Sequence, residues 1–133
     1  MRYRNRISGP LLDRIDLQVE VEVLSAEDLQ CAVPGETSEA IRIRVEAARD
    51  HMMQRQGKAN ALLSTADVDR YRRIDDKGIT LLTRAMTALK LSARGYHRIL
   101  KVARTIADLA GAERVGEAHI EEAVSYRRGL DRG

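Results

Sequence analysis

The chain has 133 residues, which is the length of one ordinary domain. Its residues are 44% hydrophobic but only 3% aromatic, without tryptophan or phenylalanine, so an aliphatic core of packed helices is favoured over a β-sandwich. With 23 basic and 20 acidic side chains, the net charge of +3 does not by itself indicate nucleic-acid binding. The single cysteine, Cys31, excludes an internal disulfide, and no segment resembles a signal peptide or has the roughly 20 apolar residues of a membrane span. We therefore expect a soluble, cytoplasmic protein that does not enter membranes.

The N-terminal stretch RISGPLLDRIDLQVEVEVL changes from a basic, turn-forming segment into an alternating run. Residues 16–23 place apolar and polar side chains on opposite faces, which is the period of a half-buried β-strand. No second run of this kind follows, so the strand either belongs to a sheet whose other strands lie elsewhere or pairs with another copy. Arg14 lies between Asp13 and Asp16, where an exposed ion pair would contribute only about 0–1 kcal/mol.

A long helix is predicted from Thr37 or Ser38 to Gly57, because apolar side chains recur there at helical spacing. Before it, Ser25 begins a short helical turn, and residues 33–35, Val-Pro-Gly, break the chain. The expected inward positions of the long helix are Ile41, Val45, Ala48 and Met52.

Four more helices are predicted downstream, so the chain is mainly α. The first begins at Ser64 or Thr65 and ends near Tyr71, and the second begins at Asp75 or Asp76 and ends near Leu89. The third follows the cap Ser92 and ends near Gly111, and the fourth begins at Gly116 and ends near Arg128. The expected inward positions of the last three are Ile79, Leu82, Met86 and Leu89; Tyr96, Ile99, Val102, Ala103, Ile106 and Leu109 or Ala110; and Ile120, Ala123 and Val124. The predicted fold is a bundle of about five helices, preceded by a short segment with one β-strand.

The motifs of common enzyme classes are absent from the sequence. It contains no phosphate-binding loop, no dinucleotide-binding glycine pattern and no zinc-binding helix motif. The three histidines, His51, His97 and His119, are predicted on separate helices, and Cys31 has no neighbouring basic helix end that would activate a thiolate. We therefore predict no metal site, and arginine chemistry remains as the candidate function.

Three long blocks, SGPLLDRIDLQVEV, LSARGYHRILKVARTIADLAG and HIEEAVSYRRGLDR, occur in this order along the chain. They resemble the magnesium chelatase-like AAA+ ATPases of the ComM/YifB competence type, and the resemblance covers almost the whole chain. It implies the C-terminal third of a larger protein, whose phosphate loop and Mg²⁺-binding carboxylates lie upstream. The implied domains are the end of the AAA+ core at 1–24, with its finger loop and strand, a linker at 25–36, and a helical lid at 37–133.

On that resemblance Arg14, in LLDRID, matches the family's arginine finger, the predicted catalytic residue. Such a guanidinium would face the γ-phosphate of ATP on a neighbouring subunit, and in related NTPases this is worth roughly 10³–10⁵ in rate. Asp13 and Asp16 would orient it. The alternative is a local ion pair on the surface.

Arg94, in LSAR, matches the family's second-sensor arginine, and Arg98, one turn on, is the second choice for this nucleotide-binding role. A first-turn position is unfavourable for a cation because the helix dipole is positive there, which suggests a functional reason. Gly95 costs about 1 kcal/mol relative to alanine within a helix and would permit close approach of another backbone or of nucleotide. The alternative for Arg94 is a side chain that extends into solvent.

Two further pairs are interpreted as structural. Arg104 and Asp108 are four residues apart, so we expect them to be neighbours on the helix surface. Tyr71 and Tyr96 could stack on adenine or on bases, but packing in or beside the core is favoured.

The resemblance implies the lid and finger of an oligomeric, hexameric ATPase that acts on DNA in natural transformation, such as in branch migration. ATP and Mg²⁺ would be cofactors of the larger protein and would not bind this chain alone, and the partners would be the upstream core, further copies and DNA. The alternative is a free-standing helical module that binds nucleic acid through its arginines, although acidic residues interleave with them. Metal insertion, which the name of the chelatase relatives suggests, has no chelating cluster to support it.

Overall fold

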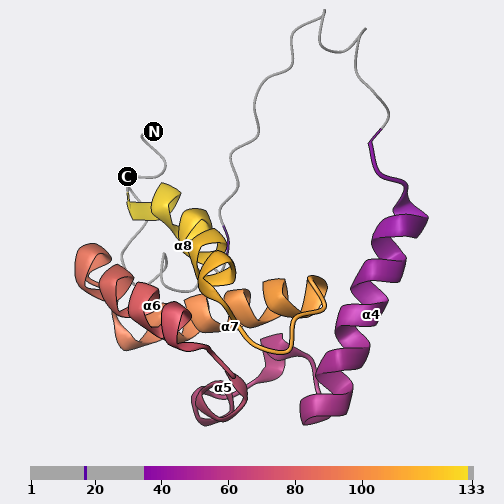
Figure 1. Ribbon diagram of the computed structural model, residues 1–133, viewed down its shortest axis with the longest axis horizontal. Coiled ribbons are helices and arrows are strands. Elements are labelled where there is room, and N and C mark those ends of the chain that lie inside the picture. The colour runs from indigo at the N-terminus through magenta and orange to yellow at the C-terminus, as the bar shows by residue number, and fades with distance from the viewer. Residues whose placement is uncertain (1–16, 18–34, 132–133) are drawn as a thin grey trace, which may run out of the picture.

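The computed structural model describes Leu17 and residues 35–131. The described helices are α4 (Ser38–Gln56), η1, a 3-10 turn (Asn60–Leu62), α5 (Thr65–Tyr71), α6 (Asp76–Leu89), α7 (Ala93–Leu109) and α8 (Glu117–Asp131) (Figure 1). The predicted mainly helical bundle is confirmed, and η1 is an element that the sequence pattern did not indicate. The predicted strand, apart from Leu17, and the turn at Ser25 lie outside the described residues.

Local side-chain hydrogen bonds define where the helices begin. At each of four N-termini the cap side chain accepts a hydrogen bond from the backbone N–H three residues on, as expected for such residues. These caps are Thr37, Ser64, Asp75 and Ser92. Gly57 adopts a φ of 76° after α4, a left-handed conformation that glycine allows, and its N–H donates to the carbonyl of Met53. The helix starts predicted at these four caps are therefore confirmed, and α8 begins at Glu117, one residue after the predicted Gly116.

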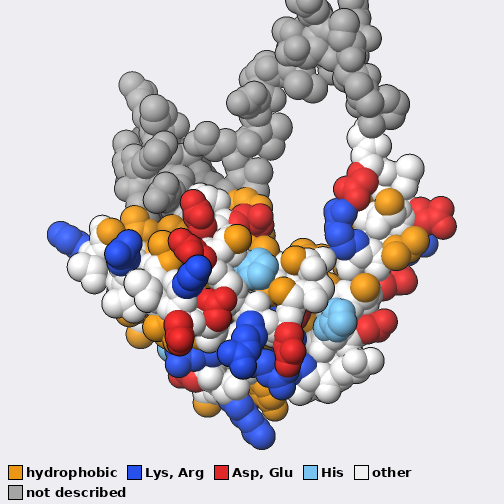
Figure 2. Space-filling view, in the orientation of Figure 1, with side chains coloured by type: hydrophobic (Ala, Val, Ile, Leu, Met, Phe, Trp, Pro, Cys, Tyr) orange, Lys and Arg blue, Asp and Glu red, His pale blue; other side chains and the backbone are white. Residues whose placement is uncertain are grey.

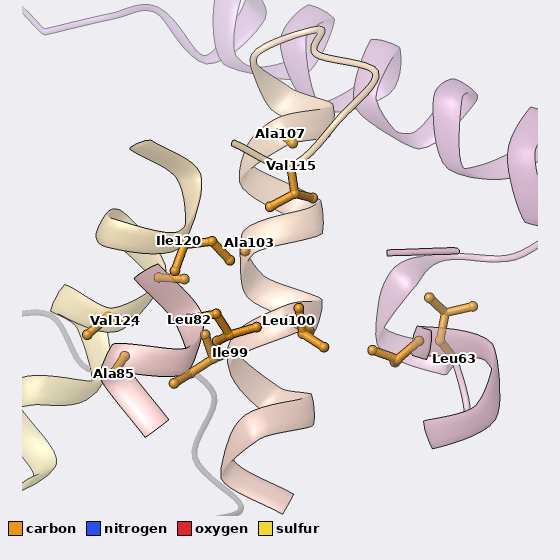
Figure 3. Close-up of a cluster of buried hydrophobic side chains, with 12 residues drawn as sticks. Leu63, Leu82, Ala85, Ile99, Leu100, Ala103, Ala107, Val115, Ile120 and Val124 are labelled. Atoms are coloured by element: carbon orange, nitrogen blue, oxygen red, sulfur yellow. The ribbon is translucent and has the colours of Figure 1, made fainter. Parts of the chain in front are cut away.

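The hydrophobic core surrounds α7, which packs against α8, α4, α5 and η1, while α6 packs against α8. Figure 3 shows α7 between the side chains of α6 and α8 on one side and Leu63 on the other. The largest fully buried side chains are Leu100, Ile120 and Val115. All members of the core cluster are aliphatic or alanine, as the composition predicted.

The predicted inward face of α4 is only half correct. Ala48 and Met52 are buried, but Ile41 and Val45 are 41% and 50% exposed. Figure 1 shows the reason: the C-terminal half of α4 lies beside η1 and α7, whereas its N-terminal half extends away from the other described helices. The apolar stripe is therefore longer than the surface that covers it in the described part of the chain.

The predicted inward face of α7 is shifted. Ile99 and Ala103 are buried as expected, but Leu100 and Ala107 are also buried, while Leu109 is exposed. The shift arises because α7 has neighbours on more than one side, so its buried arc is wider than one stripe. In α6, the expected inward residue Ile79 is exposed. In α8, the expected inward residues Ile120, Ala123 and Val124 are all buried.

Candidate functional site

The two arginines predicted to contact nucleotide lie together in one groove. Arg94 and Arg98 are one turn apart on α7 and line a groove of about 450 Å³ between α5 and α7. Leu63 and Val68 contribute apolar walls, and Lys101 adds a third basic side chain. We call this the α5–α7 groove. Lys101 was not singled out from the sequence, although its position seven residues after Arg94 places it on the same face of the helix.

The N-terminus of α7 makes this groove electropositive. Ser92 caps the helix, and the first turn contains no acidic residue that would offset the positive end of the helix dipole. Arg94 is exposed, and its side chain forms no ion pair with any residue in the described part of the chain. Arg98 is half-buried. The groove thus offers guanidinium donors and a helix N-terminus to an anion.

Gly95 and the tyrosines have structural explanations. Gly95 is buried, which favours the close approach of another part of the protein over an approach by nucleotide. Tyr96 accepts a hydrogen bond from Arg72 Nη1 at 2.9 Å. Both Tyr96 and Tyr71 pack beside the core. The prediction that both tyrosines serve packing is confirmed.

The three histidines lie on separate helices, as predicted. In the α5–α7 groove, His97 Nδ1 lies 2.8 Å from the carbonyl oxygen of Ala93, which can only accept, so Nδ1 carries a hydrogen. His97 Nε2 lies 3.4 Å from a carboxylate oxygen of Asp69, which brings one negative charge near the groove. Among the residues that the structure describes, no group of histidine, cysteine and acidic side chains could hold a metal ion.

A second set of charged side chains forms a buried network around Asp108. Asp108 Oδ1 accepts hydrogen bonds from Arg55 Nη1 at 2.8 Å and from Arg104 Nη2 at 3.1 Å. Its Oδ2 accepts from Arg55 Nη2 at 3.0 Å and from Asn60 Nδ2 at 2.9 Å. The side chains of Arg55 and Asp108 are only 8% and 1% exposed. We call these four residues the Asp108 network.

The predicted surface pair of Arg104 and Asp108 is therefore wrong in its location. Both residues are buried, and Asp108 is bonded to Arg55 at the end of α4 and to Asn60 of η1. Arg104 also donates to the carbonyl oxygens of Ala112 and Glu113, at 3.0 Å each, just after α7. The network joins α4, η1, α7 and the connection to α8, and its role is structural, as interpreted from the sequence.

The charge of Asp108 makes part of the stability depend on pH. Burial raises the pKa of the Asp108 carboxyl, but hydrogen bonds from Arg55 and Asn60 and the charge of Arg104 outweigh burial and hold this pKa below its usual value. A depressed native pKa stabilises the fold above the unfolded pKa of about 3.9, and this contribution is lost as pH falls through the native value.

We therefore expect the free energy of unfolding to fall more steeply in the wild-type chain than in Asp108→Asn as the pH is lowered from 6 to 3. Urea titrations of both chains at several pH values measure the difference. Exposed carboxyls whose pKa is also lowered, such as that of Glu36, are present in both chains and cancel. Parallel pH profiles would contradict a charged Asp108 in the native state.

Arg14, the predicted catalytic residue, lies outside the described residues together with Asp13 and Asp16. Its role as an arginine finger stays a prediction, as do the phosphate-binding roles of Arg94 and Arg98 and the boundaries 1–24, 25–36 and 37–133. None of the helices that the structure describes is both long enough and apolar enough to cross a membrane.

The fold and the groove define a helical domain with a cationic site at the N-terminus of its central helix. Comparison with known families shows to which of them the chain is related. Residues 35–127 match the family described as magnesium chelatase, subunit ChlI C-terminal, and residues 1–29 match magnesium chelatase, subunit ChlI. The chain therefore belongs to the magnesium chelatase family, which confirms the resemblance read from its three sequence blocks.

Curated relatives support the competence branch of this resemblance. The chain is 47% identical over 128 residues to competence protein ComM of Haemophilus influenzae and 41% identical to the YifB proteins of Escherichia coli and Salmonella typhimurium. Each match covers 96% of this chain but only 25% of the relative. The chain thus spans about a quarter of the length of these relatives, somewhat less than the third that the resemblance implied.

Proposed function

We propose that this chain is the lid and arginine-finger region of a larger, ring-forming AAA+ ATPase that acts on DNA. The observation that carries the proposal is the α5–α7 groove, in which Arg94 and Arg98 lie together at the N-terminus of α7. Membership of the magnesium chelatase family supports an ATP-dependent parent with Mg²⁺. The sequence itself contains no phosphate-binding loop, so the groove would cover a nucleotide held mainly by another part of the protein.

The groove suits the phosphates of a nucleotide for three reasons. Arginine presents donors in a fixed fork that matches phosphate oxygens, and Arg94 has no carboxylate partner in the described part of the chain. The first turn of α7 adds the positive end of a helix dipole. Leu63 and Val68 reduce the access of water on one side, which strengthens a charge-assisted contact.

The DNA-processing role rests on relationship. A relative at 47% identity is named a competence protein, and competence is the capacity to take up DNA. We propose that the parent works as a ring, with six subunits as the expected number, in natural transformation, for example in branch migration. Arg14 would then supply positive charge to ATP bound by the adjacent subunit.

The alternative of a free-standing nucleic-acid-binding module is less well supported. Figure 2 shows acidic and basic side chains interleaved over the helices on the face in view, without a continuous basic surface. Such a surface is what sequence-independent binding to phosphates requires. Titration with single-stranded and duplex DNA at two salt concentrations distinguishes the two functions, because the module would bind on its own with a steep salt dependence.

The replacement Arg94→Ala tests the lid function directly. In the longer protein we expect it to lower kcat/KM for ATP about 10- to 100-fold, since one hydrogen bond to a charged group contributes roughly 1.5–3 kcal/mol. Lys77→Ala removes an exposed cation of α6 outside the groove and is the matched control. Equal rates for the two variants would overturn the role of Arg94. ATP hydrolysis by the present chain alone would overturn the lid assignment.

A further inference from the structure

A groove between α6 and α8 combines apolar walls with an acidic rim. It has a volume of about 360 Å³. Leu81, Ala85 and Leu89 of α6 line it at intervals of four residues, so they share one face of that helix, and Val124 lines it from α8. We call this the α6–α8 groove. Its aliphatic walls suit the apolar face of another helix.

Two glutamates form the rim of this groove on α8. Glu117 and Glu121 both line it and are four residues apart on the helix. Both are exposed, and neither forms an ion pair with any side chain that the structure describes. Like charges at this spacing repel each other and disfavour the helix, and cations placed against them would remove this repulsion. The rim therefore suits a helix whose apolar face has basic residues beside it.

The N-terminal half of α4 has a face of this kind. Ile41 and Val45 are exposed there, one turn apart. With about 3.6 residues per turn, Arg42 and Arg49 lie along one side of this apolar pair. We call these four residues the α4 face. Three acidic residues lie on the opposite side of the helix: Glu39, Glu46 and Asp50.

The α4 face and the α6–α8 groove belong to different sides of the molecule. Figure 1 shows α4 on one side of α7, and α6 and α8 on the other. The C-terminal half of α4 is fixed to α7 by the burial of Met52 and by the bonds of Arg55 to Asp108. Because α4 is one continuous helix, this attachment holds the α4 face away from the groove of its own chain. A contact between the two surfaces therefore joins two molecules.

We propose that the α4 face of one copy of this chain docks in the α6–α8 groove of a second copy. The match between the two surfaces carries the proposal: the apolar pair of α4 would be buried against the aliphatic walls, and its two arginines would face the two glutamates of the rim. The other rim of the groove carries Arg84. The side of α4 that would face it carries Arg44, whose charge is neutralised by its ion pair with Glu36.

This contact joins two different surfaces, so it is heterologous and each copy uses one surface on each of its sides. Heterologous contacts repeat head to tail and give a ring where the rotation closes. This step rests on the proposed function, in which the longer protein forms a ring. The lids of neighbouring subunits would then touch, and α7, with its α5–α7 groove, would lie between the two contacts of each lid.

Cross-linking between subunits of the longer protein tests the docking. Native cysteines, Cys31 among them, are replaced with serine, and subunits with Val45→Cys are mixed with subunits with Ala88→Cys and treated with a short bismaleimide. The matched control uses Ile79→Cys in place of Ala88→Cys, since Ile79 is an exposed residue of α6 outside the groove. We expect several-fold more cross-linked peptide for the groove pair than for the control, measured by mass spectrometry. Equal yields, in mixtures shown to exchange subunits, would overturn the docking, and this is the result expected if another part of the same subunit covers the α4 face.

Charge reversal tests the match between the two surfaces. In the subunit that supplies the groove, Glu117→Arg with Glu121→Arg is expected to lower the cross-linking yield about tenfold, because like charges then face each other. In the subunit that supplies α4, Arg42→Glu with Arg49→Glu is expected to restore most of the yield. Failure of this second reversal to restore the yield would overturn the docking.

A control for charge reversal is available on the opposite side of α4. Glu46→Arg with Asp50→Arg changes two acidic residues at the same spacing of four, and neither carboxylate forms an ion pair within the described part of the chain. We expect this variant to keep the wild-type cross-linking yield. A loss equal to that of the rim variant would mean that net charge alone governs association, and the docking would be wrong.

Two outcomes separate this inference from the proposed function. If the groove pair cross-links but Arg94→Ala leaves ATP hydrolysis unchanged, the lid function is overturned and the docking stands. If Arg94→Ala slows hydrolysis but the groove pair does not cross-link, the docking is overturned and the lid function stands. A subunit that carries both Val45→Cys and Ala88→Cys should give a ladder of cross-linked products, and dimers alone would overturn the head-to-tail arrangement.

Discussion

Replacement of Asp108 with alanine is expected to lower the free energy of unfolding by about 3–5 kcal/mol, because it removes the only carboxylate of a buried charged network. The guanidinium groups of Arg55 and Arg104 would remain in place, with side chains only 8% and 3% exposed. Two like charges without a counter-ion repel each other and lack the solvation that they have in the unfolded chain. Chemical denaturation followed by circular dichroism measures the change.

The size of this effect follows from how many bonds one carboxylate accepts. Asp108 receives four hydrogen bonds from three side chains, and Asn60 also loses a partner when the carboxylate is removed. The total stability of a domain is only about 5–15 kcal/mol, so such a loss could leave a large unfolded fraction at ordinary temperature. The variant is therefore best studied at low temperature, where its folded fraction can be measured.

Two further variants show whether the loss of stability in Asp108→Ala comes from buried charges left without a partner. Glu36→Ala breaks the exposed ion pair with Arg44 and is expected to leave the denaturation midpoint almost unchanged, since both side chains are about half exposed. The triple variant Arg55→Met, Arg104→Met, Asp108→Leu removes all the charges and is expected to be clearly more stable than Asp108→Ala. If Asp108→Ala were as stable as wild type, the network would not be buried as described.

The helix starts could be predicted from the sequence because their cause is local. A cap side chain bonds a backbone N–H three residues away, so Thr37 or Ser92 can be recognised without knowledge of the tertiary fold. Gly57 marks the end of α4 for an equally local reason, its left-handed backbone. The choice of aliphatic core residues followed from composition alone.

Positions that depend on neighbouring elements could not be predicted in the same way. The periodicity of α4 identifies one apolar face, but only the tertiary arrangement shows that this face is covered at Met52 and uncovered at Ile41. The spacing of Arg104 and Asp108 indicates that they can pair, yet their burial depends on Arg55, which is distant in sequence. Charges four residues apart are common on helix surfaces, so spacing alone gives no sign of burial.

The candidate site, too, has residues that could be predicted from the sequence and residues that could not. The resemblance selected Arg94 and Arg98, and the structure places them in one groove with Lys101. A search of α7 for basic residues on one helical face would have added Lys101, because the three occur at spacings of four and three. The apolar walls, Leu63 and Val68, come from segments that precede α7 by many residues, and no local pattern connects them with it.

Replacement of Arg14 with alanine in the longer protein is expected to reduce ATP hydrolysis about 10³- to 10⁵-fold, the range that an arginine finger supplies in related NTPases. If Arg14 instead forms only a solvated ion pair with Asp13 and Asp16, its loss changes stability by about 0–1 kcal/mol and leaves hydrolysis unaffected. Steady-state kinetics distinguish the two roles. Arg6→Ala, in the same N-terminal segment, is the matched control and should retain the wild-type rate.

Mixed rings then show on which subunit Arg14 acts. Arg14→Ala subunits keep an intact nucleotide pocket, and subunits with a mutated phosphate-binding loop keep an intact finger, so each variant alone is inactive. In a ring with head-to-tail interfaces, an equal mixture should recover roughly a quarter of the wild-type rate, because random neighbours combine one good pocket with one good finger at that frequency. Recovery requires the finger and the pocket to come from different subunits. An inactive mixture, in rings shown to exchange subunits, would mean that Arg14 serves its own subunit, and the proposed arrangement between subunits would be wrong.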